Sequence, residues 1–187
     1  AAERFAAGNG NRRDFDDCKN EFEFLPSGGV DKRTRALLKI EDGCDNFCAY
    51  CIIPYARGRV RSISRTEAIN EILRLNDEGY RETVITGIEI SSYGKDTGDN
   101  LLSLTEAILN AVPGMRIRLG SLEPRIITDA FLTRLSAVKK ICPHFHLSLQ
   151  SGCDATLRRM NRRYDTKEFS DGVDKIRKYF DRPAITT

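Results

Sequence analysis

Short apolar runs and amphipathic stretches alternate along the chain from residue 36 onward. The apolar runs are rich in Ile, Leu and Val or alternate apolar with polar positions, which is the pattern of buried β-strands. Five strands are predicted in this way: 36–40, 83–87, 116–122, 144–149 and one that starts at 184. Between them, apolar residues recur three and four positions apart, which predicts helices that face a core. A helix between each strand and the next predicts an α/β fold of parallel strands with right-handed crossovers.

Polar residues mark the starts of these helices. Ser64 and Glu67 have the spacing of a capping box, and Gly79 stands where the same helix would end. The candidate N-caps of three further helices are Asn100, Thr128 and Asp154. Longer polar stretches follow the carboxyl ends of the predicted strands, where β/α barrels have their active sites.

Residues 1–35 lack this periodicity and have the glycine and charge content of a linker. Residues 36–187 form the predicted core domain. About four β/α units and the start of a fifth strand cannot close an eight-stranded barrel. The expected fold is therefore an open, partial β/α barrel that is truncated on its C-terminal side. The chain starts without methionine and ends in a predicted strand, so we expect a piece of a longer protein.

Three of the six cysteines fall within eight residues, where Cys44, Cys48 and Cys51 have a spacing that lets three thiolates surround one metal centre. A structural zinc ion requires four ligands, and neither His144 nor His146 forms a recognisable zinc pattern with this loop. A disulfide framework requires an even set of cysteines. An iron–sulfur cluster takes thiolate ligands, and three of them would leave one iron of a four-iron cluster open.

Composition indicates the class of protein and its cellular location but says little about its function. The 187 residues are 40% hydrophobic and 30% charged, which is ordinary for a soluble globular protein. No stretch resembles a signal peptide or a membrane span, so we expect a cytoplasmic protein without a membrane partner. The net charge of +3 neither requires nor excludes a nucleic-acid partner. Two groups of arginines could contact phosphates or form solvated basic faces: Arg57, Arg59, Arg61 and Arg65, and Arg158, Arg159, Arg162 and Arg163.

The cysteine spacing, with an aromatic residue just before the last cysteine, resembles that of the radical S-adenosylmethionine (SAM) enzymes. In that family, the open iron of a [4Fe-4S] cluster binds the amino and carboxylate groups of SAM, and an electron from the cluster cleaves SAM to a 5'-deoxyadenosyl radical. The resemblance implies that Cys44, Cys48 and Cys51 are the metal ligands and that no catalytic residue is needed beyond them.

The same resemblance implies a set of SAM contacts. The expected cofactor-binding residues are Tyr50, Gly87, Glu123, Gln150 and Arg162. Glu123 and the Gly87 backbone would bind the ammonium group, which needs acceptors. Arg162 would bind the carboxylate and Gln150 the ribose hydroxyls. Glu123 as a surface ion pair and Arg162 as an exposed salt bridge are the alternatives.

Other candidate residues have more than one interpretation. Glu89 and Tyr93 either bind substrate or order their own loop. His144 and His146 are favoured as ordinary strand histidines over residues that line a site. Three cysteines are predicted to be free or buried thiols: Cys18, Cys142 and Cys153.

Longer phrases resemble the methylthiotransferases within the radical SAM family: 33–44, 52–58, 86–88, 121–124 and 150–152. Among these enzymes, the chain is most similar to the type that adds a methylthio group to threonylcarbamoyl-adenosine beside a tRNA anticodon. The resemblance implies a transferase with a tRNA partner and a reductant. Whole members have a second [4Fe-4S] domain and an RNA-gripping β-domain, so the second cluster is expected only in a full-length protein. This chain is expected to bind cluster and SAM without completing the transfer.

Two alternatives stay open. The chain could belong to another radical SAM methylthiotransferase, acting on isopentenyl-adenosine in tRNA or on a ribosomal protein side chain. It could instead be a non-catalytic, metal-bearing RNA-binding module, which would need four metal ligands and would have no affinity for SAM.

Overall fold

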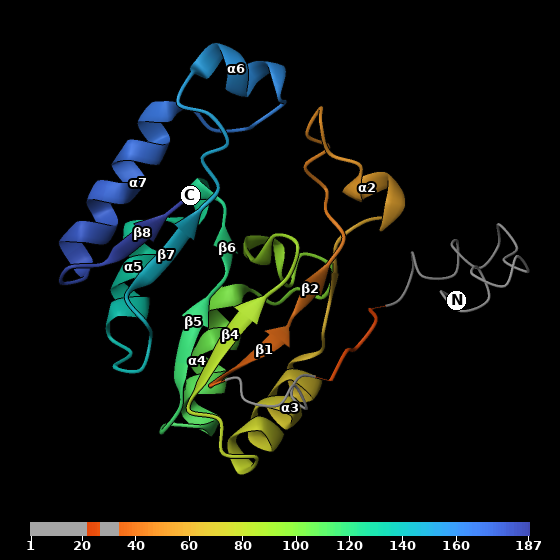
Figure 1. Ribbon diagram of the computed structural model, residues 1–187, viewed down its shortest axis with the longest axis vertical. Helices are drawn as coiled ribbons and strands as arrows, with labels where there is room; N and C mark the ends of the chain where they lie inside the picture. Colours follow the sequence, from red (N-terminus) through yellow and green to blue (C-terminus); the bar gives the residue numbers. More distant parts are fainter. Residues whose placement is uncertain (1–21, 27–33) are drawn as a thin grey trace, which may run out of the picture.

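Parallel strands lie side by side in chain order in the computed structural model, which describes residues 22–26 and 34–187. Figure 1 shows them as a curved layer with helices on its outer face. The first three-stranded sheet contains β1 (Arg35–Lys39), β4 (Glu82–Thr86) and β5 (Arg116–Leu119). The second contains β6 (Ser121–Leu122), β7 (His144–Leu147) and β8 (Ala184–Thr186). All pairings within these two sheets are parallel, as predicted.

The two sheets are joined at Gly120, which separates β5 from β6. Its amide donates a hydrogen bond to the Ile85 carbonyl (2.9 Å), and a Cβ atom at this position would come within 2.8 Å of the same oxygen. A parallel bridge between Ile117 and Ile141 continues the layer toward β7. The six parallel strands of the described residues therefore form one open, curved layer and no closed barrel, which confirms the predicted fold class.

Four longer helices cover this layer: α3 (Arg65–Asp77), α4 (Leu101–Ala111), α5 (Asp129–Ser136) and α7 (Thr166–Tyr179). Each strand turns alternate residues toward them, as in β1, where Ala36 and Leu38 are buried. They pack with fully buried helix residues such as Ile72 and Ile108 in one core. Burial of each such aliphatic side chain stabilises the fold by about 1.5–3 kcal/mol.

Local sequence patterns predicted most of the helix starts correctly. Both hydrogen bonds of the capping box between Ser64 and Glu67 are present at α3, and Asn100 and Thr128 cap α4 and α5. The prediction for Asp154 was wrong. It is the first residue of the short helix α6 (Asp154–Arg159), and its carboxylate accepts a hydrogen bond from the Thr166 amide (2.8 Å) instead. The Thr166 amide, at the first residue of α7, is one of the amides at a helix start that have no acceptor within the helix, and the tertiary fold brings the Asp154 carboxylate to it.

Five short elements were not predicted. β2 (Glu41–Asp42) pairs antiparallel with β3 (Arg61–Ser62), and the short helix α2 (Ile53–Ala56) lies between them in the chain. Two single 3-10 turns, η3 (Ile90–Ser92) and η4 (Pro124–Ile126), follow β4 and β6. The β2–β3 pair closes the base of the loop that carries the three clustered cysteines.

The linker predicted for residues 1–35, with Cys18 in it, lies outside the described residues except for 22–26, 34 and 35. Among the described helices, none combines the length and the apolar composition needed to cross a lipid bilayer.

Candidate functional site

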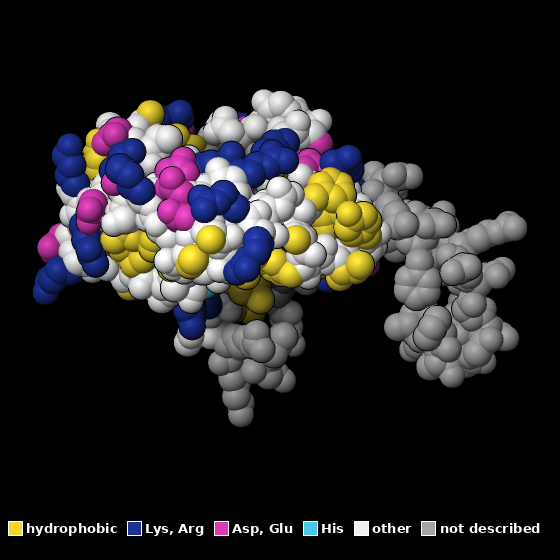
Figure 2. Space-filling model, turned by 90° about the horizontal axis from the view of Figure 1, so that it is seen from above, with side chains coloured by type: hydrophobic (Ala, Val, Ile, Leu, Met, Phe, Trp, Pro, Cys, Tyr) yellow, Lys and Arg dark blue, Asp and Glu magenta, His cyan; other side chains and the backbone are white. Residues whose placement is uncertain are grey.

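The cysteine loop lies beyond the carboxyl ends of the parallel strands. Figure 2 looks down on this end and shows hydrophobic side chains gathered on the side where α2 lies in Figure 1. Tyr50, Ile52 and Tyr55 of this region are each more than half exposed. Since strand ends in β/α folds position functional loops, the loop is placed where a site is expected.

The base of the loop is held by a tight backbone contact. Gly43 has a φ angle of +78°, and the amide of Cys44 donates to the Gly58 carbonyl (3.2 Å). A Cβ atom at Gly43 would lie 2.0 Å from the Arg59 carbonyl oxygen. Glycine is therefore required here for conformation and for space.

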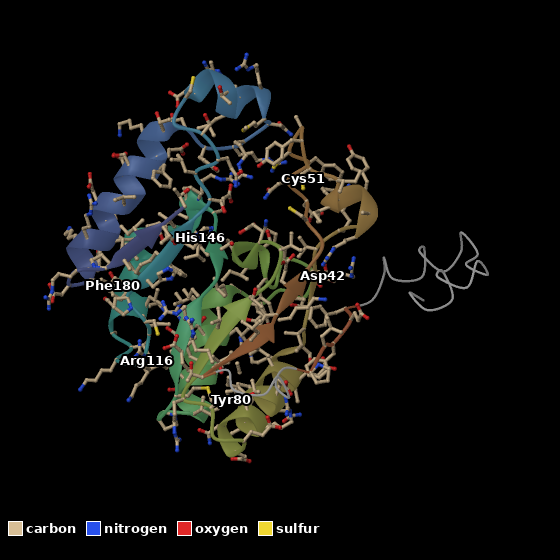
Figure 3. The ribbon with its side chains drawn as sticks, in the orientation of Figure 1. Asp42, Cys51, Tyr80, Arg116, His146 and Phe180 are labelled. Carbon is tan, nitrogen blue, oxygen red and sulfur yellow. The ribbon has the colours of Figure 1, made fainter. Side chains whose placement is uncertain are left out.

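Asp42 connects both ends of the loop. Its carboxylate accepts hydrogen bonds from the Gly43 amide (2.8 Å), from Lys39 (2.7 Å) and from Arg57 (3.2 Å), and Arg61 lies 4.0 Å away. Burial by itself would raise the pKa of Asp42, but the hydrogen bonds from Lys39 and the Gly43 amide outweigh it and lower the pKa. Figure 3 shows Asp42 near β2 and Cys51 further along the loop.

All three clustered cysteines are free thiols; Cys44 and Cys48 are buried and Cys51 is half-buried. Burial raises the pKa of the Cys44 thiol, so a metal would have to displace its proton. Within the described ranges, no group of three His, Cys, Asp or Glu side chains is arranged around a single-ion site. A four-iron cluster makes a different demand, because each thiolate binds a different iron.

A turn from the far half of the chain contacts this loop. The Met160 carbonyl accepts a hydrogen bond from the Ala49 amide (3.0 Å), and Asn161 Nδ2 donates to the Phe47 carbonyl (3.0 Å). Phe47 and Asn161 both have positive φ angles, +47° and +58°. Left-handed conformations at non-glycine residues cost energy and are often found at functional sites.

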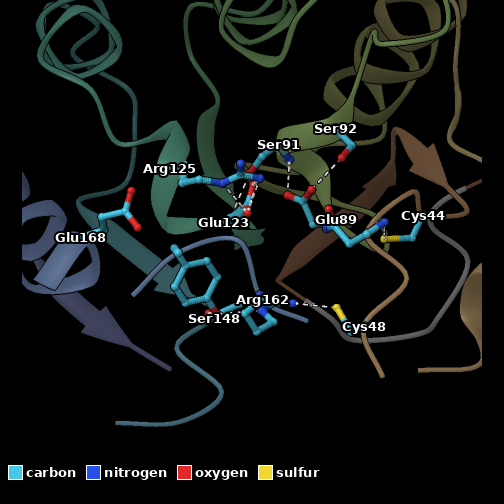
Figure 4. A network of polar contacts seen from close by, with 12 residues as sticks. Cys44, Cys48, Glu89, Ser91, Ser92, Glu123, Arg125, Ser148, Arg162 and Glu168 are labelled. Atoms are coloured by element: carbon cyan, nitrogen blue, oxygen red, sulfur yellow. Dashed lines mark hydrogen bonds and ion pairs between the residues drawn. The ribbon is translucent and has the colours of Figure 1, made fainter. Parts of the chain in front are cut away.

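Arg162 brings a guanidinium group to the loop. Its Nη1 lies 3.2 Å from the Cys48 Sγ, and its Nε donates to the Tyr164 hydroxyl (3.0 Å), as Figure 4 shows for the cysteine contact. The Tyr164 hydroxyl donates to the backbone carbonyls of Ser148 and Leu149 after β7. The side chain of Arg162 is therefore fixed next to a cysteine rather than free in solvent.

Glu123 follows β6 and is buried, with only 8% exposed. Both of its carboxylate oxygens accept hydrogen bonds from Arg125, which donates through Nε (2.8 Å) and Nη2 (2.9 Å). Its amide donates to the Ser91 hydroxyl (2.9 Å). The sequence analysis identified Glu123 as a candidate but missed Arg125. The only signal for Arg125 was its position two residues after Glu123, on the other side of Pro124.

Gly87 packs against Glu41 of β2. A Cβ atom at Gly87 would lie 2.7 Å from Glu41 Oε2, which accepts the Glu89 amide hydrogen bond (2.8 Å). Glu41 is fully buried, and its other oxygen has no hydrogen-bond partner among the described residues. Burial raises the pKa of Glu41 to about 8, opposed only in part by the Glu89 amide. Near neutral pH this side chain is largely an uncharged acid.

Stability of the iron-free chain is expected to decrease from about pH 4.5 to about pH 8 because of Glu41. The unfolded chain releases this proton near 4.5, whereas the folded chain retains it up to about 8, so rising pH favours unfolding across that window. Glu41→Gln should remove this part of the pH dependence and stabilise the chain at pH 8 by a few kcal/mol. Urea unfolding at pH 5 and pH 8 measures the difference. Glu78→Gln at the exposed C-cap of α3 controls for the loss of one carboxylate. Equal pH profiles for Glu41→Gln and the unchanged chain would contradict the expectation.

Two remaining predicted contacts lie at the surface of this region. Tyr50 is 54% exposed, between Cys48 and Cys51 in the loop. Gln150 is exposed and has a φ angle of +64°, so the chain turns sharply directly after β7. The predicted site residues thus all border the cysteine loop or the strand ends.

Several other candidates have structural partners. Glu89 accepts hydrogen bonds from the Ser91 amide and the Ser92 hydroxyl, and Tyr93 is buried with its hydroxyl 3.4 Å from Asp99, so both order their own loop. The first arginine group is largely engaged with carboxylates: Arg57 and Arg61 with Asp42, Arg59 with Asp45, and Arg65 with Asp99. In the second group, three arginines are exposed: Arg158, Arg159 and Arg163.

The remaining histidines and cysteines lie apart from the loop. His144 and His146 share the Thr186 hydroxyl on the face of β7 opposite its buried residues, so both have a partner on the neighbouring strand β8. Cys142 is buried and Cys153 is exposed, both as free thiols, as predicted.

Comparison with known proteins gives consistent matches. The family model for the radical SAM superfamily matches residues 38–187. The threonylcarbamoyladenosine tRNA methylthiotransferase MtaB of Bacillus subtilis (strain 168) is 41% identical over 168 residues, which is 89% of this chain and 37% of that protein. A tRNA-2-methylthio-N(6)-dimethylallyladenosine synthase of Thermoanaerobacter sp. (strain X514) is 36% identical over 174 residues, 92% of this chain and 37% of that protein.

A solved structure supports the fold. The radical S-adenosylmethionine methyltransferase TsrM from Kitasatospora setae, whose structure contains cobalamin and a [4Fe-4S] cluster, superimposes with a TM-score of 0.59 at 14% identity. The match covers 76% of this chain and 28% of TsrM. The chain spans about 37% of the length of the curated relatives named above. The match of the family model to residues 38–187 shows that the chain belongs to the radical SAM superfamily.

Proposed function

We propose that the chain binds a [4Fe-4S] cluster through Cys44, Cys48 and Cys51 and binds SAM at the iron that these residues leave open. The observation that carries the proposal is the contact between Arg162 and Cys48, which brings a fixed cation from beyond β7 to the cysteine loop. An anionic cluster and the SAM carboxylate both favour a guanidinium group at this place.

The donor set fits a cluster. Three free thiols lie in one loop at the strand ends, and the Asn46 amide already donates to the Cys44 sulfur (3.4 Å), as it would to a thiolate. When bound, the cluster and SAM supply the one-electron chemistry of the reaction. The chain's own residues bind, orient and partly shield these groups.

Three strand-end residues, Gly87, Glu123 and Gln150, would surround SAM together with Arg162 and Tyr50. Glu123 and the Gly87 backbone would accept from the ammonium group, and the contact of Glu123 with Arg125 would be shared or displaced. Arg162 would bind the SAM carboxylate, and Gln150 the ribose hydroxyls. Tyr50, exposed between two of the ligands, would contact SAM beside the cluster.

For the protein to which this chain belongs, we propose methylthio transfer to a modified adenosine beside a tRNA anticodon, with threonylcarbamoyl-adenosine as the substrate. The identity of 41% to MtaB over 89% of the chain supports this. The partners would be the tRNA anticodon arm and a reductant in the cytoplasm, with a second [4Fe-4S] cluster in the full-length protein. Residues 36–187 would be the radical SAM core and 1–35 its linker.

A dimethylallyl-adenosine substrate is the second candidate. The synthase from Thermoanaerobacter is 36% identical over 92% of the chain, so overall similarity separates the two substrates only weakly. Both candidates share the cluster, SAM and a tRNA partner.

The test of the proposed function is anaerobic reconstitution with iron and sulfide, followed by dithionite reduction with SAM. We expect about four irons per chain and formation of 5'-deoxyadenosine. Bound zinc, or no metal at all, would contradict the proposal.

Arg162→Ala is expected to weaken SAM binding about tenfold or more, because it removes a charge-assisted hydrogen bond. Arg163→Ala is the matched control, since Arg163 is exposed one position further along. It should change the affinity by less than about twofold, as exposed charges contribute little. Anaerobic calorimetric titration of both reconstituted variants measures the effect. The reverse order would move the carboxylate contact to Arg163.

A further inference from the structure

A cavity of about 460 Å³ lies behind η3 and η4, and the proposed function does not use it. Its wall is mostly apolar and includes Leu102 and Phe131, with Ser91, Arg125 and Arg134 among its polar residues. The volume and the mixture of an apolar wall with a few polar groups are typical of sites for small organic groups. The same Arg125 holds Glu123, so the cavity adjoins the proposed SAM site.

The free hydrogen-bonding capacity of the cavity consists mainly of donors. Arg125 uses Nε and Nη2 for Glu123, and its Nη1 has no partner among the described residues. The Ser91 hydroxyl accepts from the Glu123 amide, and Asn100 Oδ1 accepts from the Ser103 amide, which leaves the hydroxyl proton and the Asn100 NH₂ group to donate. A group of donors that includes the cations Arg125 and Arg134 favours a carboxylate.

Charge balance leads to the same ligand. Glu123 and Arg125 form a neutral pair, and a SAM ammonium group on Glu123 would add one positive charge. Arg125 would then share its partner carboxylate with a second cation, and a carboxylate at Nη1 of this exposed side chain would balance the added charge. The two candidate substrates differ in this respect, because a threonylcarbamoyl group ends in a carboxylate and a dimethylallyl group is a hydrocarbon.

We infer that Arg125 is a specificity-determining residue, which binds the carboxylate of the threonylcarbamoyl group on adenosine N6 while the cavity takes up the rest of that group. This rests on the proposed function. Ser91 and Asn100 supply further donors to the carboxylate or the threonyl hydroxyl, and the apolar wall accommodates the threonyl methyl group. A dimethylallyl group in the same cavity would offer no acceptor to Nη1 of Arg125 and would lack this charge-assisted hydrogen bond.

Equilibrium binding to the reconstituted chain in saturating SAM tests the inference without turnover. The probes are N6-threonylcarbamoyladenosine, its methyl ester, which lacks the negative charge, and N6-dimethylallyladenosine. We expect the acid to bind about tenfold or more tightly than either neutral nucleoside, as a charge-assisted hydrogen bond provides. Arg125→Gln should bring the ratio of acid to ester affinity close to one, and Arg125→Lys should restore part of it.

Arg134→Gln is the matched control. Arg134 lines the same cavity and uses Nε and Nη2 for a carboxylate as Arg125 does, but its partner is Glu106 and not the proposed SAM contact Glu123. This variant should keep the ratio of the unchanged chain. A ratio that survives Arg125→Gln, a ratio that disappears in Arg134→Gln, or no binding of the acid at all overturns the inference. Thermal unfolding confirms that each variant is folded.

The same samples separate the two levels of the proposal. Iron content and 5'-deoxyadenosine formation report on the proposed function. If both are found but the acid and its methyl ester bind with equal affinity, only the proposed role of Arg125 is contradicted. If the cluster does not form, the proposed function itself fails.

Discussion

Cys48→Ser is expected to reduce the iron content of the reconstituted chain from about four irons to below about one. Two thiolates cannot hold the cluster firmly, and a serine hydroxyl is a poor replacement because it does not give up its proton as readily as a thiol. The substitution also removes the sulfur that lies 3.2 Å from Arg162 Nη1, so the cation loses its partner in the loop. Formation of 5'-deoxyadenosine should disappear together with the iron.

Cys153→Ser is the matched control for this experiment. Cys153 is an exposed free thiol just before α6 and is not a predicted ligand. Its iron content should equal that of the unchanged chain. Iron retained in Cys48→Ser, or iron lost equally in both variants, would contradict the assignment of the three clustered cysteines as cluster ligands.

Gly43→Ala is expected to destabilise the chain by about 3 kcal/mol or more and to prevent stable cluster binding. The alanine Cβ would lie 2.0 Å from the Arg59 carbonyl oxygen and 2.6 Å from its carbonyl carbon, both backbone atoms. The clash separates the two sides of the loop base and breaks the hydrogen bond from Cys44 to Gly58. Denaturant unfolding and iron content measure the two effects.

Gly98→Ala separates the clash from the conformational cost. Gly98 has the same φ angle as Gly43, +78°, but a Cβ atom added to it would have no atom within 4 Å. Its replacement should cost only about 1–2 kcal/mol, the penalty of a left-handed conformation, and should leave the iron content unchanged. An equal loss of stability in the two variants would show that the contact with Arg59 is unimportant.

The order of the strands followed from the sequence because each strand and helix is specified locally. Residues such as Ala36 and Leu38 alternate with exposed neighbours, and Ser64 with Glu67 forms a cap within four residues. Short parallel crossovers then leave little freedom in topology. The cysteine spacing is equally local, so the loop and its three candidate ligands could be predicted without a structure.

The surroundings of the loop could not be predicted in this way. The two-residue strands β2 and β3 are too short to give a periodic pattern. Asp42 pairs with Lys39, Arg57 and Arg61 because the end of the cysteine loop folds back beside its beginning. No local sequence pattern predicts that the two ends of the loop meet. The same holds for Glu41, whose buried acid faces Gly87 and the amide of Glu89.

By itself, the sequence determined the α/β class, most of the helix caps and the three candidate thiolates, since these depend on residues a few positions apart. Only the tertiary structure decided which distant groups surround the thiolates. Arg162 lies 114 residues from Cys48 in the chain and 3.2 Å from it in space. Little in the sequence distinguishes Arg125 from the other arginines, whereas the fold places it between Glu123 and a cavity. Such long-range contacts are set by packing of the whole core, which local patterns do not encode.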